Sequence, residues 1–321
     1  MSGFWDGNPA LAGQLEEVRS AIREGAASDD KEVQTSIGLL LESNGKMLRP
    51  AFVILASQFG NPVSDRITRV AAAVEMLHMA TLAHDDIIDR AALRRGVATL
   101  YAARGPRTAV LVGDWLFASC FAMITDFAAA ENSRALSQIV ARICGSEVSQ
   151  SAERHVMSTS VRRYLRRIAG KTAALFALSF HVGAHESSCS AELCTRLRRL
   201  GYCLGMGFQI IDDILDVEGL ESATGKPTGQ VLAGGIYTLP TVLALRNDDG
   251  KLRKALSRRP VSRRALSRTA ALIRQRGGIE GALAVAQRYT ERSLREISTL
   301  PACETRTVLE NVADALLHRK R

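Results

Sequence analysis

Aromatic residues are scarce in this chain of 321 residues, where Phe, Trp and Tyr together make up 5%. The strict alternation of apolar and polar residues that marks strands is almost absent too, whereas helical periodicity recurs nearly throughout. Ala, Leu and Arg, which favour helices, are abundant. These features argue against a fold built mainly from sheets and predict an all-α protein.

C-x-x-C pairs are also missing, and we expect neither a signal peptide nor a membrane span. None of the six cysteines belongs to a C-x-x-C pair, which in a chain this long is typical of reduced, mostly buried thiols in the cytosol. The opening segment, MSGFWDGNPALAGQLEEVRS, has acids where a signal peptide needs bases and an apolar core. No uncharged apolar stretch is as long as a membrane span. We therefore expect a cytoplasmic protein with at most peripheral membrane contact.

What the sequence does contain is two Asp-Asp-x-x-Asp clusters. They comprise Asp85, Asp86 and Asp89, and Asp212, Asp213 and Asp216. On a helix, the first and last aspartate of each cluster share a face, to which His78 and Gln209 also belong. A solvated acidic face would explain one such cluster, but both follow apolar sequence, where unpaired carboxylates are costly to bury. Hard oxygen ligands suit Mg²⁺, so we expect one multi-metal site between facing helices.

Basic residues complete a second pattern, and the net charge of +9 favours anionic partners. Four short segments carry them: Lys46 and Arg49 in NGKMLRP, Arg94 and Arg95 in LRRG, Lys171 with Thr172 in AGKT, and Lys226 in TGKP. Each segment is weak by itself. Together they supply the donors and fixed positive charge that phosphate oxygens require.

In this order, and over nearly the whole chain, these motifs resemble those of trans-polyprenyl diphosphate synthases of the medium- and long-chain type, such as heptaprenyl and octaprenyl diphosphate synthases. The resemblance implies a single domain over residues 1–321, a large all-α bundle of the isoprenoid synthase type with a central cavity. It also implies a reaction in which isopentenyl diphosphate is condensed head-to-tail onto an allylic diphosphate, farnesyl or geranylgeranyl. No protein nucleophile is needed.

The resemblance also assigns roles to residues. All six aspartates would serve catalysis, and three Mg²⁺ ions would be present with substrate bound. The metal ligands would be Asp85, Asp89 and Asp212, with Asp86, Asp213 and Asp216 as further ligands or supports behind them. The allylic diphosphate would contact Arg94, Lys171, Thr172, Gln209 and Lys226. Isopentenyl diphosphate would contact Lys46, Arg49, His78 and Arg95.

Two positions depart from the family pattern. Val231 stands where many members have an aspartate, and Ile236 stands where many have a second lysine. Both lie in the long Gly- and Thr-rich segment 218–240, whose length is typical of a functional lid. The departures leave the expected activity intact and put the role of this segment in question.

Product length is expected to depend on the turn before the first cluster. Ala80 and Thr81 are small, and Leu77 lies one turn further back. Short-chain relatives tend to have aromatic residues at the positions of Ala80 or Thr81, which block the path of the growing chain. The open path predicts a product from hexaprenyl to decaprenyl diphosphate, with a farnesyl or geranylgeranyl diphosphate synthase as the alternative.

Other functions fit less well. A class I terpene cyclase shares the first aspartate cluster, but its second metal motif has an Asn-Ser-Glu pattern and it needs no isopentenyl site. A regulatory subunit or helical scaffold could lose its metal motifs, and here both are complete. Nucleic-acid binding is disfavoured because aromatics are sparse. The partner stays open between a homodimer and a heterodimer with a small regulatory subunit, without which the chain could be inactive.

Overall fold

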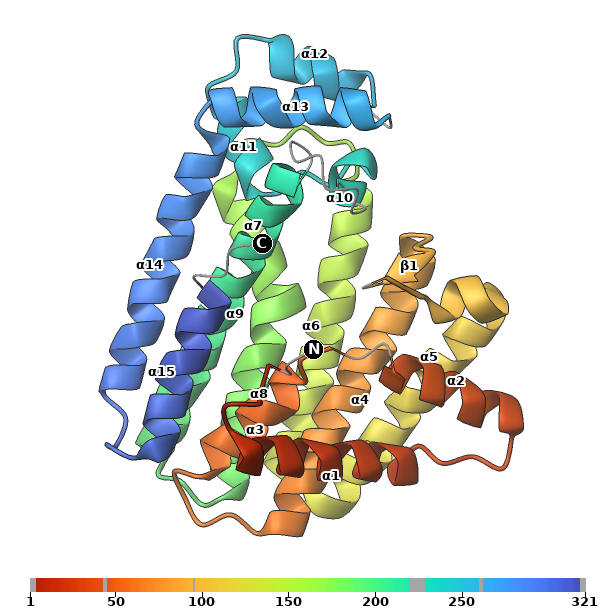
Figure 1. The fold of residues 1–321 in the computed structure, drawn as a ribbon, viewed down its shortest axis with the longest axis vertical. Helices are drawn as coiled ribbons and strands as arrows, with labels where there is room; N and C mark the ends of the chain where they lie inside the picture. Colours follow the sequence, from red (N-terminus) through yellow and green to blue (C-terminus); the bar gives the residue numbers. More distant parts are fainter. Residues whose placement is uncertain (1–3, 43–44, 95, 220–228, 260–261, 318–321) are drawn as a thin grey trace. The chain divides into compact units, whose positions relative to one another are not determined.

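The protein is all-helical in the computed structural model, which describes residues 4–42, 45–94, 96–219, 229–259 and 262–317 (Figure 1). The α-helices are α1 Pro9–Gly25, α2 Lys31–Glu42, α3 Leu48–Ser57, α4 Ser64–Ile88, α5 Leu100–Phe127, α6 Ala130–Ala152, α7 Val161–Ile168, α8 Ala174–Glu186, α9 Ala191–Gly219, α10 Gln230–Ala233, α11 Leu239–Arg246, α12 Lys251–Ser257, α13 Arg263–Gln275, α14 Gly278–Ser298 and α15 Glu304–Leu317. A π-helical segment, η1 Ala169–Ala173, joins α7 to α8. Strands β1 Leu93–Arg94 and β2 Val97–Ala98 form one antiparallel pair. The predicted all-α fold class is confirmed.

Local sequence explains where several helices begin. The Asn8 side chain accepts a hydrogen bond from the backbone N–H of Leu11, and Pro9 occupies the first turn of α1. Thr99 caps α5 in the same way, and that helix starts at Leu100. Polar caps and an early proline satisfy or remove N–H groups that the first helical turn leaves without partners.

Helix α5 changes direction near its start. Gly105 has φ of 82°, a left-handed conformation that glycine adopts without strain, and Pro106 follows it.

By length and composition alone, α5 could cross a membrane. Core helices of soluble proteins often meet the same criterion, so this is weak evidence for a membrane span.

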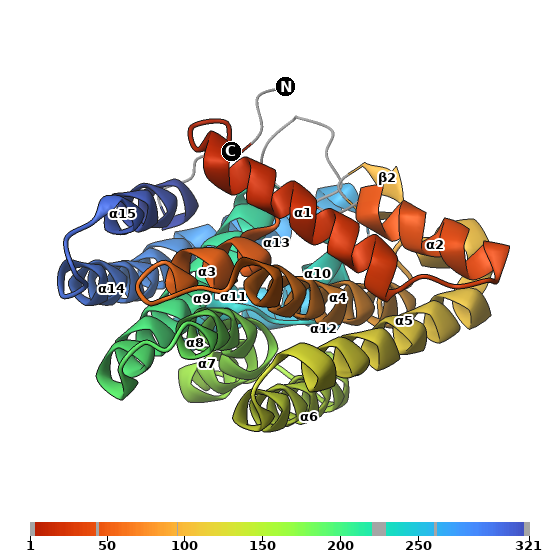
Figure 2. The same cartoon turned by 90° about the horizontal axis from the view of Figure 1, so that it is seen from below.

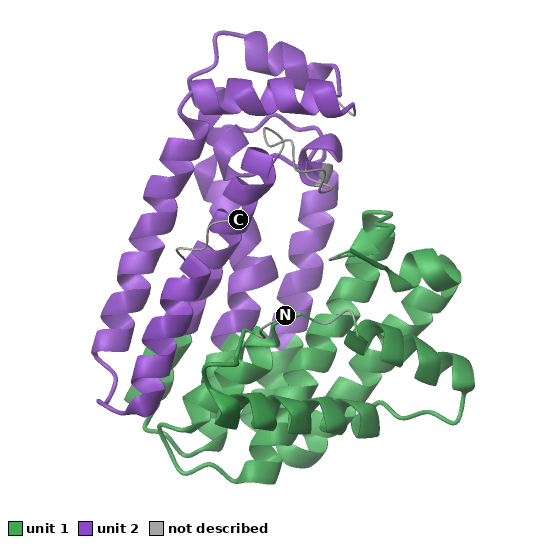
Figure 3. Ribbon diagram, viewed as in Figure 1, with its two compact units in different colours: residues 1–137, 178–198 green, residues 138–177, 199–321 purple. Residues whose placement is uncertain are grey.

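The chain divides into two compact units, coloured separately in Figure 3. Unit 1 comprises residues 1–137 and 178–198, and unit 2 comprises residues 138–177 and 199–321. The divisions fall inside α6, α8 and α9 rather than in linkers. A single domain over residues 1–321, and its central cavity, stay predictions.

Unit 1 is built around α4, which lies beside α5 in both views (Figures 1 and 2). Nearly every residue from 70 to 77 is completely buried, as expected of a helix that is apolar on all sides. Phe52 of α3 stacks on Phe180 of α8 with ring centroids 4.7 Å apart. Gly183 allows this close approach, because a Cβ atom there would collide with the backbone of Val53.

Unit 2 has its own core, formed by the second half of α9 with α7, α11, α13 and α14. Its central residues include Met206, Ile210 and Ile214 from α9 and Ile273 from α13. The core packs directly behind the second aspartate cluster, so the helix that carries those aspartates is rigidly held.

Candidate active site

The first aspartate cluster lies at the end of α4, in unit 1. Exposure along this helix follows the helical repeat: His78, Thr81 and Asp85 are half-buried and Asp89 is exposed, whereas Ala80 between them is fully buried. The predicted stripe from His78 to Asp89 is therefore open to solvent, as are the neighbouring residues Leu82, His84 and Ile87. Asp89 is the C-cap of α4, and its N–H donates to the carbonyl of Asp85.

The middle aspartate of this cluster, Asp86, points elsewhere. Its carboxylate is 3% exposed and accepts two hydrogen bonds on Oδ1, from Nε and Nη2 of Arg94 at 3.0 and 2.8 Å. Burial raises the pKa of Asp86 above its usual value, and the Arg94 guanidinium opposes that shift. Arg94 lies in β1, so this ion pair joins the short hairpin to the end of α4. In this structure Arg94 supports the cluster, and its contact with the allylic diphosphate stays a prediction.

The predicted isopentenyl diphosphate ligands on α3 lie where that helix begins. Met47, in a left-handed conformation, precedes the first turn, which contains Arg49 and Pro50. Lys46 is exposed, with Nζ 4.4 Å from the centre of the Phe4 ring. Its carbonyl accepts a hydrogen bond from the Trp5 indole at 2.6 Å. The aromatic pair at the N-terminus thus holds the Lys46 backbone in place. Arg95 lies outside the described residues.

The second aspartate cluster lies on α9, in unit 2. Asp212 and Asp216 are half-buried on one face with Gln209, as the spacing predicts. Asp216 accepts a hydrogen bond from the backbone N–H of Gly229 at 2.9 Å. Gly229 follows the segment that contains Lys226, which also lies outside the described residues.

Asp213 lies beside this face, is buried, and is held from two sides. It is 8% exposed; Tyr164 of α7 donates a hydrogen bond to Oδ2 at 2.6 Å, and Gln209 donates to Oδ1 at 2.9 Å. Gln209 in turn accepts a hydrogen bond from the Thr172 hydroxyl at 2.7 Å. Burial raises the pKa of Asp213 to about 7, against the two hydrogen bonds. These hydrogen bonds link Thr172 of η1 and Tyr164 of α7 to Gln209 and Asp213 of α9. Thr172 and Gln209 are the two predicted ligands of the allylic diphosphate among them.

Tyr164 itself was missed by reasoning from sequence. It is 2% exposed, and burial together with the Asp213 carboxylate raises its own pKa well above the usual value. The sequence does contain an indication of its role. Tyr164 precedes Lys171 by seven residues, or two helical turns, and its hydroxyl group is a polar group among apolar residues.

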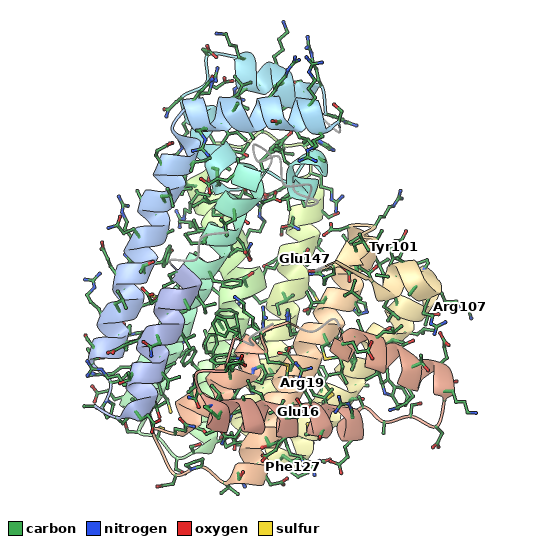
Figure 4. All side chains as sticks on the ribbon, in the orientation of Figure 1. Glu16, Arg19, Tyr101, Arg107, Phe127 and Glu147 are labelled. Carbon is green, nitrogen blue, oxygen red and sulfur yellow. The ribbon has the colours of Figure 1, made fainter. Side chains whose placement is uncertain are left out.

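Lys171 lies in the π-helical segment η1, an irregularity that is often found at functional sites. Its ammonium group is 2.6 Å from Oε1 of Glu147 on α6, a residue labelled in Figure 4. Glu147 also accepts a hydrogen bond from Gln150. The adjacent Gly170 lets η1 approach α6, since a Cβ atom there would collide with the Ser146 hydroxyl. The Glu147 carboxylate therefore positions Lys171. A bound diphosphate would have to attract the Lys171 ammonium group more strongly than Glu147 does.

The donor set suits a cation that completes its coordination with water and substrate oxygens. Each helix offers a pair of accessible carboxylates four residues apart, on Asp85 and Asp89 and on Asp212 and Asp216. Within the described ranges, no three His, Cys, Asp or Glu side chains gather as a metal cage. Such partial oxygen sites fit Mg²⁺, which keeps several waters and bridges to phosphate, better than they fit zinc.

Comparison with known proteins identifies the family. Residues 30–273 match the polyprenyl synthetase family. The chain belongs to that family. It is 37% identical over 298 residues to heptaprenyl diphosphate synthase component 2 of Bacillus subtilis, covering 92% of this chain and 86% of that protein.

Solved structures of polyprenyl synthetases have the same fold. Heptaprenyl diphosphate synthase of Staphylococcus aureus superposes with a TM-score of 0.90 at 33% identity, over 96% of this chain and 98% of that one. Geranylgeranyl pyrophosphate synthase of Lactobacillus brevis gives a TM-score of 0.92 at 33% identity, over 98% and 99%. Since products of different length come with equally similar folds, the fold by itself does not determine product length.

Proposed function

We propose that this polyprenyl synthetase is a Mg²⁺-dependent trans-prenyltransferase that makes a medium- or long-chain all-trans polyprenyl diphosphate. The observation that carries the proposal is the pair of aspartate clusters. In each, the outer aspartates share an accessible helix face, while the middle one is buried and held by a specific partner, Arg94 or Tyr164. Family membership supports the same reaction, and the heptaprenyl and nonaprenyl synthases among the relatives support a long product.

In the proposed reaction the chain's own residues bind and orient two diphosphates. Asp85, Asp89 and Asp212 would hold Mg²⁺, which supplies positive charge that stabilises the departing pyrophosphate. The Lys171 ammonium adds fixed positive charge to the allylic diphosphate, and Lys46 and Arg49 would bind isopentenyl diphosphate.

Bond changes then require no protein nucleophile. The allylic C–O bond breaks, and the electron pair leaves with pyrophosphate. The isopentenyl double bond attacks the allylic carbon to form a C–C bond. A proton is then lost to pyrophosphate, which restores a double bond and leaves a chain five carbons longer.

Product length depends, in this proposal, on the half-buried face of α4 one turn before Asp85. Thr81 is on that face, and its hydroxyl donates to the carbonyl of His78 at 2.7 Å. Ala80 is fully buried, and so is Leu77. A small residue at Thr81 leaves room beside the cluster. The alternative, a farnesyl or geranylgeranyl diphosphate synthase, requires a block further along the path.

We also propose that the enzyme contains a second subunit. The outer face of α5 exposes Leu111 by 58%, Val110 by 40% and Trp115 by 39%, and Ala118 and Ala122 beside them are exposed too. Such a contiguous apolar face on a long helix is typical of a surface that another chain covers. The name component 2 of the Bacillus relative supports a heterodimer with a small subunit, and a homodimer is the alternative. In either form we expect the enzyme in the cytoplasm.

The decisive experiment is to incubate the purified chain with Mg²⁺, farnesyl diphosphate and isopentenyl diphosphate, then extract and size the prenyl products. Products of six to ten isoprene units are expected, with none formed in EDTA. Full activity in EDTA would refute the metal proposal. Termination at farnesyl or geranylgeranyl diphosphate, with any natural partner subunit present, would refute the product length. Size-exclusion chromatography with light scattering, comparing Leu111→Asp with the matched exposed control Val63→Asp, tests the α5 surface.

A further inference from the structure

The positive charge of this protein is concentrated in one short segment. Residues 251–276 contain ten Lys and Arg residues and no Asp or Glu, which leaves 32 basic and 33 acidic residues in the rest of the chain. Outside this segment the formal net charge is therefore −1, against +9 for the whole chain. The basicity is thus a property of one region of unit 2, formed by α12 and α13.

Both helices turn a basic face outward. Leu252 and Leu256 of α12, and Leu266 and Ile273 of α13, are buried in the core of unit 2. In Figure 4, nitrogen-tipped side chains project from the outer side of these two helices. Among the exposed basic residues of this segment are Arg253, Lys254, Arg258, Arg259, Arg264 and Arg268. We call these six the basic face.

The nearby carboxylates do not neutralise the basic face. Asp248 and Asp249, just before α12, form ion pairs with Arg276, and Asp249 also pairs with Lys251 at 3.3 Å. Glu218 pairs with Arg274. Within the described part of the chain, none of the six residues of the basic face forms an ion pair with a carboxylate. Their charge is available to an anionic partner.

We propose that the basic face binds the surface of an anionic lipid membrane. Clusters of four to eight Lys and Arg residues on amphipathic helices are typical of binding to acidic lipid headgroups. Segment 251–276 contains no aromatic residue, which disfavours single-stranded nucleic acid, where bases stack on aromatic side chains. A membrane also suits the proposed function, on which this step alone rests, because a polyprenyl chain of thirty carbons or more leaves water for a bilayer.

The proposal predicts the strength of binding. Each Lys or Arg near an anionic surface changes the membrane partition coefficient by about fivefold at physiological ionic strength. Replacing four of the six by neutral residues is therefore expected to lower partitioning by roughly a hundredfold or more. Salt should have the same effect, because surface charge is screened within about 8 Å at 0.15 M.

The test is co-sedimentation of the full-length protein with vesicles of phosphatidylcholine alone or of phosphatidylcholine mixed with phosphatidylglycerol. The test variant replaces Arg253, Arg258, Arg264 and Arg268 with Gln. The matched control replaces four exposed arginines elsewhere in unit 2 with Gln, an equal change in net charge: Arg199, Arg288, Arg292 and Arg295. Circular dichroism melting checks that both variants fold.

We expect the wild type and the control variant to sediment with phosphatidylglycerol vesicles only, and the test variant to remain in solution. Equal binding by both variants would show that net charge rather than this face is responsible, and would overturn the proposal. So would binding to heparin or DNA without binding to vesicles. Sedimentation needs no turnover, so a failure here is separate from a failure of the proposed enzymatic activity.

Discussion

Removing the hydrogen bond from Tyr164 to Asp213 tests whether a buried partner holds the middle aspartate of the second cluster in place. Tyr164→Phe deletes the hydroxyl that donates to Oδ2 at 2.6 Å and leaves a buried carboxylate with one partner, Gln209. A hydrogen bond to a charged group contributes about 1.5–3 kcal/mol, and a buried group that loses its partner keeps its desolvation cost. We expect the free energy of unfolding to fall by about 2 kcal/mol at pH 8.

The loss should depend on pH, in a direction that the Asp213 pKa determines. Burial raises this pKa from 3.8 to about 7 in the folded protein, so between those values the folded state binds a proton that the unfolded state has released. The contribution of Asp213 to the free energy of unfolding is therefore fully present below about pH 4. It decreases as the pH rises toward 7, by on the order of a few kcal/mol. Because the tyrosine hydroxyl stabilises the ionised carboxylate, its removal raises the Asp213 pKa further and costs more at pH 8 than at pH 5.

The assay is urea denaturation followed by circular dichroism, in EDTA so that no divalent cation bridges the aspartates. Tyr289→Phe is the matched control, since Tyr289 is a half-buried tyrosine of unit 2 whose hydroxyl forms no hydrogen bond with the described residues. If Tyr164→Phe unfolds like the control at both pH values, the hydrogen bond does not hold Asp213 in place. A companion variant, Asp213→Asn, should flatten the dependence of stability on pH between 4 and 7.

The other predictions concern turnover. Asp85→Ala or Asp212→Ala should each remove several kcal/mol of transition-state stabilisation, the scale of metal charge stabilisation; kcat/KM near the wild-type value at saturating Mg²⁺ would contradict this. Thr81→Phe should shorten the product while the first condensation continues, and chromatographic sizing of the products decides it, with an unchanged length distribution counting against the proposed path. Thr81 is the better position for this test than the fully buried Ala80, where Ala80→Phe would overpack the interior. Lys171→Gln should raise KM for the allylic substrate and Lys46→Gln that for isopentenyl diphosphate; equal effects of either change on both Michaelis constants would argue against separate sites.

Much of the fold and part of the site could be predicted from sequence. Helical periodicity and scarce aromatics indicated an all-α protein, because burying one stripe of a helix requires apolar residues at a 3.6-residue repeat. The same repeat predicts that Asp85 and Asp89 share a face, as do Asp212 and Asp216, and none of these four residues is fully buried. These are local properties of a helix, and spacing alone determines them.

The spacing of residues in the sequence does not predict which side chain each aspartate or lysine contacts. Helical spacing leaves each middle aspartate beside the accessible face, and only the tertiary structure buries it and brings Arg94 to Asp86 and Tyr164 to Asp213. Tyr164 is separated from Asp213 by 49 residues. Lys171, expected from sequence to contact the allylic diphosphate, forms an ion pair with Glu147 on a different helix, a partner that the sequence does not reveal. Such contacts depend on how α6, α7, η1 and α9 pack around one core, and burial in that core raises the pKa of Asp213.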